Sequence, residues 1–181
     1  MIDEVLKDAD HKMDQAVVHT TQEFGGIRTG RANPGLLNRI TVDYYGTQTQ
    51  LQQIAGFSVP EARLLVIQPY DKTAIPAIER AIQEADLGLN PSNDGNVIRL
   101  AFPSLTEERR KELIRLVRHL AEDGRVAIRN VRRHCKDHLE SEDASEDEVR
   151  RAEKVLQEMT DQHIERLDEI LQAKEEELLE V

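Results

Sequence analysis

The sequence predicts an α+β protein in which a long three-helix bundle carries a small α+β unit inserted after its first helix. Apolar residues recur at spacings of three and four near both ends of the 181-residue chain, as expected for amphipathic helices. Between these regions the pattern changes to alternation with a period of two, which is typical of strands. The composition is 39% hydrophobic, 33% charged and only 3% aromatic, which favours extended, solvated helices around an aliphatic core.

The first helix is expected over residues 2–27. Gly25, Gly26 and Gly30 weaken helix propensity, and Pro34 disfavours a helical conformation of Asn33, so the helix should end between residues 25 and 33. Its apolar positions form a seam at the coiled-coil period: Ile2, Leu6, Ala9, Met13, Ala16, Thr20, Phe24 and Ile27.

The middle of the chain predicts strands around one helix. Strands are expected at residues 40–44, 64–67 and 97–102, the last of them after the turn signal Asn93-Asp94-Gly95. A helix is expected from Thr73 to Asp86, because isoleucines and alanines recur there at helical spacing.

Two further long helices are expected after Pro103. The second covers residues 105–140, with Thr106 as its N-cap, and would form a rod of roughly 54 Å if unbroken. The polar stretch from Glu140 to Glu148 predicts a turn. The third helix, from 149 to 179, should pack through Val149, Ala152, Leu156, Met159, Leu167, Ile170, Leu171 and Leu178.

This pattern predicts a bundle made of residues 1–30 and 105–181, and an inserted domain of residues 31–104. The chain passes between them twice, at 31–34 and 102–105, and two such linkers form a natural hinge. The hinge residues are expected to be Arg31, Ala32, Asn33, Pro34, Pro103, Ser104 and Leu105.

Charge is distributed unevenly along the chain, whose formal net charge is −11. Residues 104–140 carry ten Lys and Arg against seven Asp and Glu, whereas residues 141–181 carry five against fifteen. At 100° per residue, the cations of the second helix fall in one arc of about 100°, interrupted by Glu122. We call this set the arginine row: Lys111, Arg115, Arg118, Arg125, Arg129, Arg132 and Lys136.

The arginine row should face solvent or a partner, because apolar residues occupy the opposite arc. These are Leu113, Val117, Leu120, Gly124, Ala127, Val131 and Cys135. Arginine suits bidentate phosphate contacts, and the scarcity of aromatics favours the backbone of a folded RNA over a single strand. Two alternatives stay open: a solvated face neutralised by the acidic third helix, and a helical adaptor that binds a protein through that helix.

Other motifs give weak signals. Residues 25–32 nearly match a phosphate-binding loop, but Arg31 and Ala32 replace its lysine and hydroxyl, so a nucleotide hydrolase is a minor alternative. His134, Cys135 and His138 lack an evident fourth metal ligand. His11, His19, His119 and His163 are dispersed, without a visible nucleophile or carboxylate partner. We therefore expect no catalytic residues, metal site or cofactor.

Cellular location follows from simple features. The longest uninterrupted apolar run is residues 64–67, too short to span a membrane, and the N-terminus lacks a targeting pattern. The single cysteine, Cys135, fits a reducing compartment. A cytoplasmic protein without membrane contact is expected.

Five segments, in order along the chain, closely resemble the ribosome recycling factor family. They are IRTGRANP (27–34), VDYYG (42–46), DLGLNP (86–91), LTEERRK (105–111) and RVAIRNVRR (125–133). The resemblance implies an L-shaped protein with a β/α/β domain inserted at a flexible elbow of a three-helix bundle. It also implies a monomeric, non-catalytic translation factor that acts after termination.

The resemblance further implies partners and binding residues. With elongation factor G and GTP, such a factor splits the post-termination ribosome into subunits and permits release of mRNA and deacylated tRNA. Its bundle lies along large-subunit rRNA at the aminoacyl and peptidyl sites. Arg132 matches the principal rRNA-contacting arginine, and Ser104 departs from a common second proline, which should loosen the linker. Together with the arginine row, the resemblance predicts rRNA contacts from Arg28, Arg31, Arg110, Arg118, Arg125, Arg129, Arg132 and Arg133.

Overall fold

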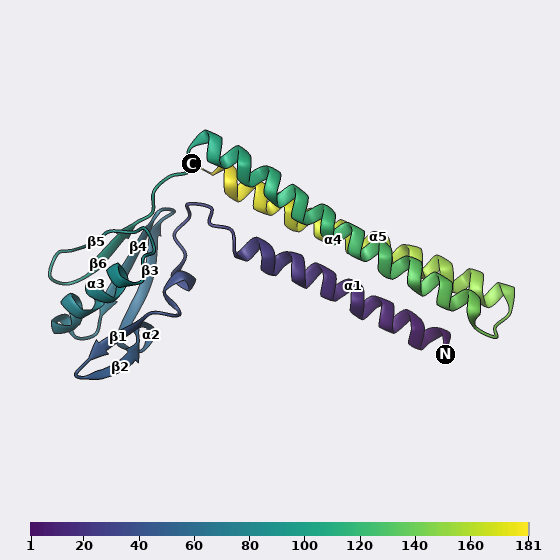
Figure 1. Cartoon of the computed structure of the whole chain (residues 1–181), viewed down its shortest axis with the longest axis horizontal. Helices are drawn as coiled ribbons and strands as arrows, with labels where there is room; N and C mark the ends of the chain where they lie inside the picture. The colour runs from purple at the N-terminus through teal and green to yellow at the C-terminus, as the bar shows by residue number, and fades with distance from the viewer. Residues whose placement is uncertain (181) are drawn as a thin grey trace. The chain divides into compact units, whose positions relative to one another are not determined.

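The computed structural model describes residues 1–180 and combines long helices with a small sheet, which confirms the α+β fold class (Figure 1). The chain divides into two compact units. One contains Met1–Thr29 and the segment from Thr106 onward, and the other contains Gly30–Leu105. Within residues 1–180, no helix combines the length and apolar character that crossing a membrane requires.

The first unit is a bundle of three helices, α1 (Ile2–Gly25), α4 (Glu107–Ser141) and α5 (Glu146–Leu179). Helix α1 ends at Gly25, inside the predicted interval. On α4, however, Ala127 is exposed and the neighbouring Ile128 is buried, so the expectation that Ala127 faces the core was wrong. The apolar stripe of a straight helix drifts around its axis over 35 residues, which shifts the inward position by one residue here.

Helices α4 and α5 both begin with side-chain caps. Thr106 Oγ1 accepts a hydrogen bond of 3.1 Å from the Arg109 N–H, which confirms that Thr106 is the N-cap of α4. Ser145 and Glu148 form a capping box, in which hydrogen bonds from the Ser145 backbone and hydroxyl lower the pKa of Glu148. Helix α5 therefore starts at Glu146, and the turn is shorter than the predicted stretch from Glu140 to Glu148.

Side chains of α1 and α5 pack directly against Gly124 of α4. A Cβ atom built at this position would lie 2.5 Å from Thr20 Oγ1 on α1 and 2.6 Å from Leu167 Cδ1 on α5. Thr20 and Leu167 are both buried. Glycine is the residue that fits this contact, because any other residue would push against the buried Thr20 and Leu167 side chains.

The second unit contains a four-stranded antiparallel sheet, a two-stranded hairpin and short helices. The sheet has the order β3-β4-β6-β5, and the hairpin pairs β1 with β2. The strands are β1 (Thr41–Tyr44), β2 (Thr47–Gln50), β3 (Ala55–Glu61), β4 (Leu64–Pro69), β5 (Pro91–Asn93) and β6 (Ile98–Ala101). The helices are η1 (Pro34–Leu37), α2 (Leu51–Ile54), η2 (Lys72–Ala74) and α3 (Ile75–Glu84).

Three strands of this unit, β1, β4 and β6, coincide with the predicted ones. Helix α3 is shorter than predicted because Asp71 caps a separate 3₁₀ turn before it. The aliphatic core of the unit comes entirely from its own residues: Ala32, Leu37, Ile40, Val42, Leu51, Ile54, Ala55, Leu65, Ile67, Ala74, Ile75, Ile78, Ile82, Ile98 and Leu100.

The two ends of the second unit lie side by side. The Ala32 N–H donates to the Ala62 carbonyl at 2.7 Å, and the Phe102 N–H donates to the Arg63 carbonyl at 2.8 Å. Gly30 adopts a left-handed conformation with φ of 76°, and a Cβ atom there would lie 3.3 Å from the Pro103 carbonyl oxygen. The chain thus enters and leaves this unit at one place.

Candidate nucleic-acid interface

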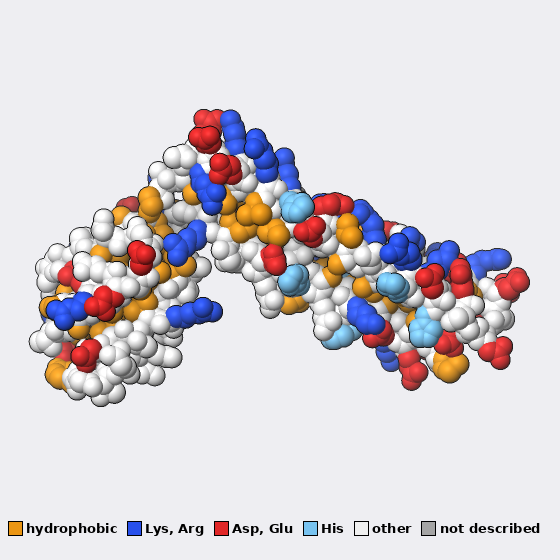
Figure 2. Space-filling view, viewed as in Figure 1, with side chains coloured by type: hydrophobic (Ala, Val, Ile, Leu, Met, Phe, Trp, Pro, Cys, Tyr) orange, Lys and Arg blue, Asp and Glu red, His pale blue; other side chains and the backbone are white. Residues whose placement is uncertain are grey.

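The arginine row lies on the outer side of α4. Its lysines and its arginines at 115, 118 and 129 are exposed, whereas Arg125 and Arg132 are partly buried. Leu113, Val117 and Cys135 lie on the opposite side of the helix and are buried against α1 and α5. Lys and Arg side chains gather along this edge of the bundle in the space-filling view (Figure 2). The helix therefore presents a line of cations to solvent.

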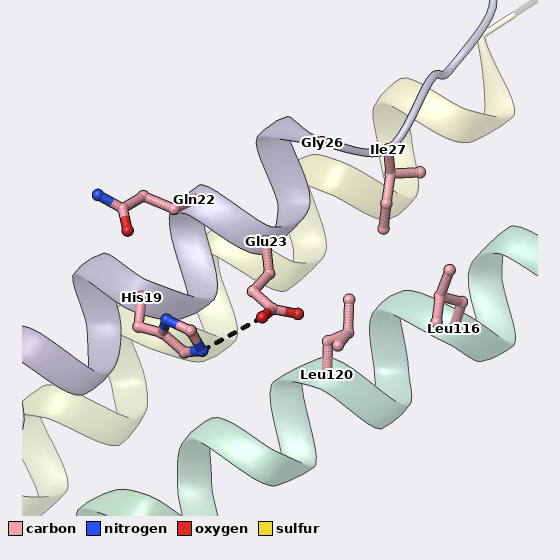
Figure 3. Close-up of a pocket in the computed structure, with 7 residues that line it drawn as sticks. All are labelled: His19, Gln22, Glu23, Gly26, Ile27, Leu116 and Leu120. Atoms are coloured by element: carbon pink, nitrogen blue, oxygen red, sulfur yellow. Dashed lines mark ion pairs between the residues drawn. The ribbon is translucent and has the colours of Figure 1, made fainter.

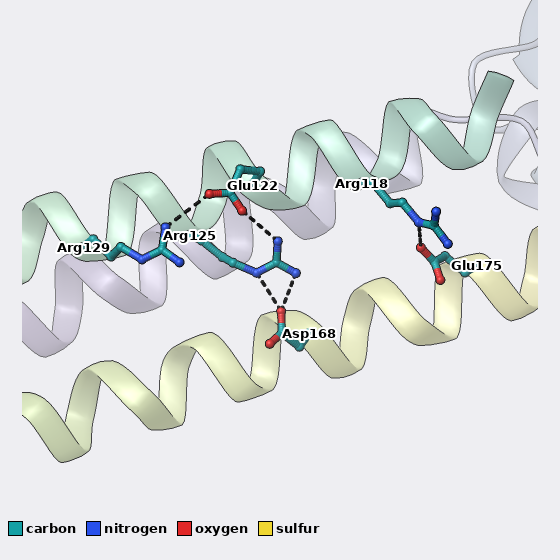
Figure 4. Close-up of polar contacts among 6 residues, drawn as sticks. All are labelled: Arg118, Glu122, Arg125, Arg129, Asp168 and Glu175. Carbon is teal, nitrogen blue, oxygen red and sulfur yellow. Dashed lines mark hydrogen bonds and ion pairs between the residues drawn. The ribbon is translucent and has the colours of Figure 1, made fainter. Parts of the chain in front are cut away.

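Five of the seven members of the arginine row are paired with carboxylates, all except Arg115 and Arg132, and Figure 4 shows the three arginines among them. Arg125 Nε and Nη2 donate to one Asp168 oxygen at 2.8 and 2.6 Å, and its Nη1 donates to Glu122 at 3.0 Å. Arg118 Nε donates to Glu175 at 2.6 Å. Because Asp168 and Glu175 belong to α5, the acidic helix neutralises part of the row, as the charge-balance alternative expects.

These pairs shift the ionisation of their members. Burial lowers the pKa of Arg125, but hydrogen bonds to Asp168 and Glu122 outweigh this effect and raise it above the ordinary value. The hydrogen bond to Glu175 raises the pKa of Arg118. Hydrogen bonds from Arg125 and Arg129 lower the pKa of Glu122. All these groups therefore stay charged near neutral pH, and Glu122 keeps its negative charge inside the row.

Two arginines of this basic surface contact neutral acceptors. Arg132 Nη1 donates to the Gln157 side chain at 3.1 Å, and Arg133 Nη2 donates to the Asn130 side chain at 3.0 Å. Among residues 1–180, no carboxylate lies within ion-pair distance of Arg115, Arg132 or Arg133. An unneutralised guanidinium with a preset orientation is suited to receive an external phosphate.

The remaining predicted arginines lie outside the row. Arg28 is exposed in the segment that follows α1, and Arg110 is partly buried in the first turns of α4. The buried Nε of Arg110 has no hydrogen-bond partner among the described residues. Arg31 belongs to the other unit. The structure thus places six of the eight predicted arginines on α4: Arg110, Arg118, Arg125, Arg129, Arg132 and Arg133.

An open pocket of about 500 Å³ lies between α1 and α4 (Figure 3). His19 and Glu23, four residues apart on α1, form an exposed pair across 3.2 Å, and Leu116 and Leu120 face them from α4. The lining residues are His19, Gln22, Glu23, Gly26, Ile27, Leu116 and Leu120. They bring together no nucleophile with a base, so the pocket offers no catalytic arrangement.

The structure also places the weaker motifs. Residues 25–32 follow the C-terminus of α1, where carbonyl groups rather than N–H groups are unsatisfied, so this loop lacks the donors of a phosphate site. Cys135 is buried, which raises its thiol pKa, whereas His134 and His138 are exposed. The three residues do not converge on one point.

One expectation was wrong: three of the four dispersed histidines have carboxylate partners. His19 and His119 form exposed pairs with Glu23 and Asp123, and His163 forms a partly buried one. His163 Nε2 lies 2.9 Å from an Asp14 oxygen and 3.4 Å from an Asp10 oxygen, both on α1. The partners are about 150 residues away in the sequence, so periodicity within one helix could not reveal them. The signal in the sequence that could have indicated these partners was the spacing of Asp10 and Asp14, which lie one turn apart on the first helix.

Comparison with known proteins identifies the family. The sequence model described as "Ribosome recycling factor" matches residues 20–179. The ribosome-recycling factors of Acidothermus cellulolyticus and Thermobifida fusca are 55% and 52% identical to this chain, each over 100% of both sequences. A solution structure of a ribosome recycling factor, 45% identical, superimposes with a TM-score of 0.76 over 99% of this chain and 98% of that one.

A second structural relative comes from a larger assembly. It belongs to models of the T. thermophilus ribosome recycling factor and the E. coli elongation factor G bound to the E. coli post-termination complex. That chain is 44% identical and superimposes with a TM-score of 0.64 over 99% of this chain and 100% of its own length. Motifs, fold and sequence identity over the full length agree, and the chain belongs to the ribosome recycling factor family.

Proposed function

We propose that this protein binds the ribosome after termination and, with elongation factor G and GTP, splits the complex into subunits. The split would permit release of mRNA and deacylated tRNA. The similarity to a chain bound to a post-termination complex together with elongation factor G supports these partners. In this proposal the factor works as a cytoplasmic monomer and performs no covalent chemistry, and its partner hydrolyses the GTP.

The observation that carries the proposal is the exposed arginine row on α4. Its unneutralised members, Arg115 and Arg132, together with the adjacent Arg133, supply donors for phosphates of large-subunit rRNA at the aminoacyl and peptidyl sites. Arg118, Arg125 and Arg129 would exchange their carboxylate partners for phosphates on docking. Arg28, Arg31 and Arg110 are proposed as additional contacts. If four to six arginines bind phosphates, affinity should fall by on the order of a decade or more for each few-fold rise in salt.

A hinge completes the proposed mechanism. The two adjoining linkers, residues 31–34 and 102–105, would let the inserted unit turn while the bundle stays docked. Each unit has its own core, so such a rotation leaves both hydrophobic interiors intact. Force supplied by elongation factor G would then reach the ribosome through a rigid body.

The decisive experiment is a subunit-splitting assay on purified post-termination ribosomes, followed by light scattering. Splitting should require this protein, elongation factor G and GTP together, and should stop when any one is omitted. Intact ribosomes in the complete mixture would refute the proposal. GTP or ATP hydrolysis by the isolated chain would favour the nucleotide hydrolase instead.

Co-sedimentation separates the proposal from the helical adaptor. A factor that docks through the arginine row should pellet with large subunits in moderate salt and dissociate as the salt concentration rises. An adaptor that binds protein through α5 should stay in the supernatant.

A further inference from the structure

His163 connects two helices in the middle of the bundle, on residues that the proposed function does not use. It lies on α5, is only 8% exposed, and directs its Nε2 atom at two carboxylates of α1. The Asp14 oxygen is 2.9 Å from Nε2 and the Asp10 oxygen is 3.4 Å from it. All three atoms lie within 4.8 Å of one another, the one such group of potential metal ligands among residues 1–180.

The ring is oriented by a contact outside this group. His163 Nδ1 lies 2.7 Å from the Met159 carbonyl oxygen, which can only accept a hydrogen bond. Nδ1 must therefore carry a hydrogen. In a neutral imidazole this leaves a lone pair on Nε2, so a buried acceptor nitrogen faces two acceptor oxygens with no hydrogen between them. Such an arrangement requires a cation at Nε2.

The surroundings favour a metal ion over a proton as this cation. A proton on Nε2 would be shared with the Asp14 oxygen alone and would leave the half-exposed Asp10 carboxylate to solvent. Arg166 reaches the same Asp14 oxygen only at 3.8 Å and its side chain is 63% exposed, so its charge is largely screened. A dication would neutralise both carboxylates at once.

The two distances from Nε2 to the carboxylate oxygens also fit a metal site. Bonds of about 2.0–2.1 Å to nitrogen and oxygen in a tetrahedral site place the ligand atoms roughly 3.3 Å apart. The observed separations of 2.9 and 3.4 Å bracket this value. Donation from the second ring nitrogen to a backbone carbonyl is the usual way of fixing a metal-binding histidine. Asp10 is exposed, so water can complete the coordination.

The geometry points to a divalent transition-metal site of the zinc class, formed by His163, Asp14 and Asp10, that joins α1 to α5. This departs from the expectation of no metal, which rested on sequence neighbours alone. The ligands come from helices far apart in the chain, so a bound ion acts as a cross-link and stabilises the folded bundle by mass action. The site is independent of the arginine row and would persist in protein that never meets a ribosome.

The test uses the full-length protein after chelator treatment. Titration calorimetry should detect one Zn²⁺ per chain. Zn²⁺ at about one hundred times its dissociation constant should raise the melting temperature by about 5–10 °C. Co²⁺ in the same site should show the intense visible absorption of a four-coordinate ion. Absence of binding and of a melting shift would overturn the proposal and leave a proton as the cation.

Two variants assign the ligands. Asp14→Asn keeps the size of the side chain, and its amide can donate to Nε2, so the variant should fold without metal and bind Zn²⁺ at least about tenfold more weakly. His163→Gln should lose the Co²⁺ spectrum. Asp137→Asn, on the exposed face of α4, makes the same charge change away from the site and should bind normally. Equal Zn²⁺ affinity in Asp14→Asn and Asp137→Asn would place any bound metal elsewhere and refute the site.

Discussion

Arg125 donates two hydrogen bonds, of 2.8 and 2.6 Å, to a single oxygen of Asp168, so the acidic helix places its own anion at the centre of the arginine row. Arg118 and Glu175 repeat the arrangement two turns away. These carboxylates occupy the donors that an external phosphate would use. Helix α5 therefore competes with external phosphates for the arginines of α4. The negative charge of α5 should for this reason influence the affinity of the arginine row for rRNA.

Removing that competitor should strengthen docking. Asp168→Asn keeps the shape of the side chain but frees the Arg125 guanidinium and removes a negative charge near the bound phosphates. We expect large-subunit affinity to rise several-fold, and stability to fall by less than about 1 kcal/mol, because Asp168 is half exposed and Arg125 keeps Glu122 as a second partner. Co-sedimentation at several salt concentrations measures the change. Glu158→Gln, which makes the same charge change on another face of α5, should leave affinity nearly constant; weaker binding of Asp168→Asn would contradict the competition.

Arg132 should matter more for docking than for folding. Its guanidinium contacts Gln157, a neutral partner, so Arg132→Ala removes no ion pair from the bundle. We expect large-subunit affinity to fall about tenfold or more, the value of one charge-assisted hydrogen-bonded contact, with a melting temperature within a few degrees of the parent. Arg150→Ala on α5 is the matched control. A comparable loss of folding and binding would indicate a structural role instead.

The linker at Ser104 offers a test of the hinge. Ser104→Pro adds a second rigid residue after Pro103, and should leave docking nearly intact while slowing subunit splitting several-fold. Ala32→Pro is less suitable, because the Ala32 N–H donates to the Ala62 carbonyl and its loss would destabilise the inserted unit. Ser104→Ala controls for the lost hydroxyl. Unchanged splitting by Ser104→Pro would remove this linker from the mechanism.

Gly124 should be intolerant of even a methyl group. The added Cβ would lie 2.5 Å from Thr20 Oγ1 and 2.6 Å from Leu167 Cδ1, so Gly124→Ala forces these side chains, or the helices that carry them, to shift. Overpacking costs about 1–3 kcal/mol, whereas helix propensity gains roughly 1 kcal/mol, so we expect net destabilisation of up to about 2 kcal/mol. Urea unfolding followed by circular dichroism measures it. Gly25→Ala, where a Cβ meets nothing within 4 Å, should be neutral or stabilising.

The inserted unit should lose stability in acid through Asp71. Hydrogen bonds from the Thr73 hydroxyl, the Tyr45 hydroxyl and the Thr73 N–H hold the pKa of this carboxyl at about 2, below its ordinary 3.8. Because the folded-state pKa is the lower one, the stabilisation is fully present above pH 3.8 and disappears as the pH falls through about 2. The pKa of Asp94 is also held at about 2, so this residue contributes to the same dependence of stability on pH.

Asp71→Asn should flatten this dependence between pH 4 and 2. All three tyrosines of the chain belong to the inserted unit and tryptophan is absent, so tyrosine fluorescence during urea unfolding isolates the relevant transition. Asp43→Asn on β1 should keep the parental slope. If Asp71→Asn unfolds with the parental pH dependence, the hydrogen bonds around Asp71 do not supply the acid sensitivity.

How far the sequence predicts this fold depends on how local each signal is. The end of α1 near Gly25 and the Thr106 cap follow from residues close together in the chain, and both are observed. Strands β2, β3 and β5 escaped prediction, because β2 is wholly polar, β3 contains Gly56 and Pro60, and β5 has only three residues. Their pairing partners, rather than their own composition, make them strands.

For the candidate surface, too, local signals were predictable from the sequence and contacts between helices were not. The arginine row is a pattern within one helix, so helical periodicity was enough to find it. Its pairing with Asp168 and Glu175, and the meeting of His163 with Asp10 and Asp14, depend on how different helices are aligned. Periodicity predicts which side of a helix faces inward, but it does not predict the axial register between helices.

The adjoining entry and exit of the inserted unit have an evolutionary consequence. Gly30 and Pro103 meet at one point, and every core residue from Ala32 to Leu100 packs within the same unit. A mutation that loosens one interior therefore leaves the packing of the other unchanged. Each unit can therefore accumulate substitutions independently of the other. A unit from a distant relative should replace the native one when the chains are joined at this junction.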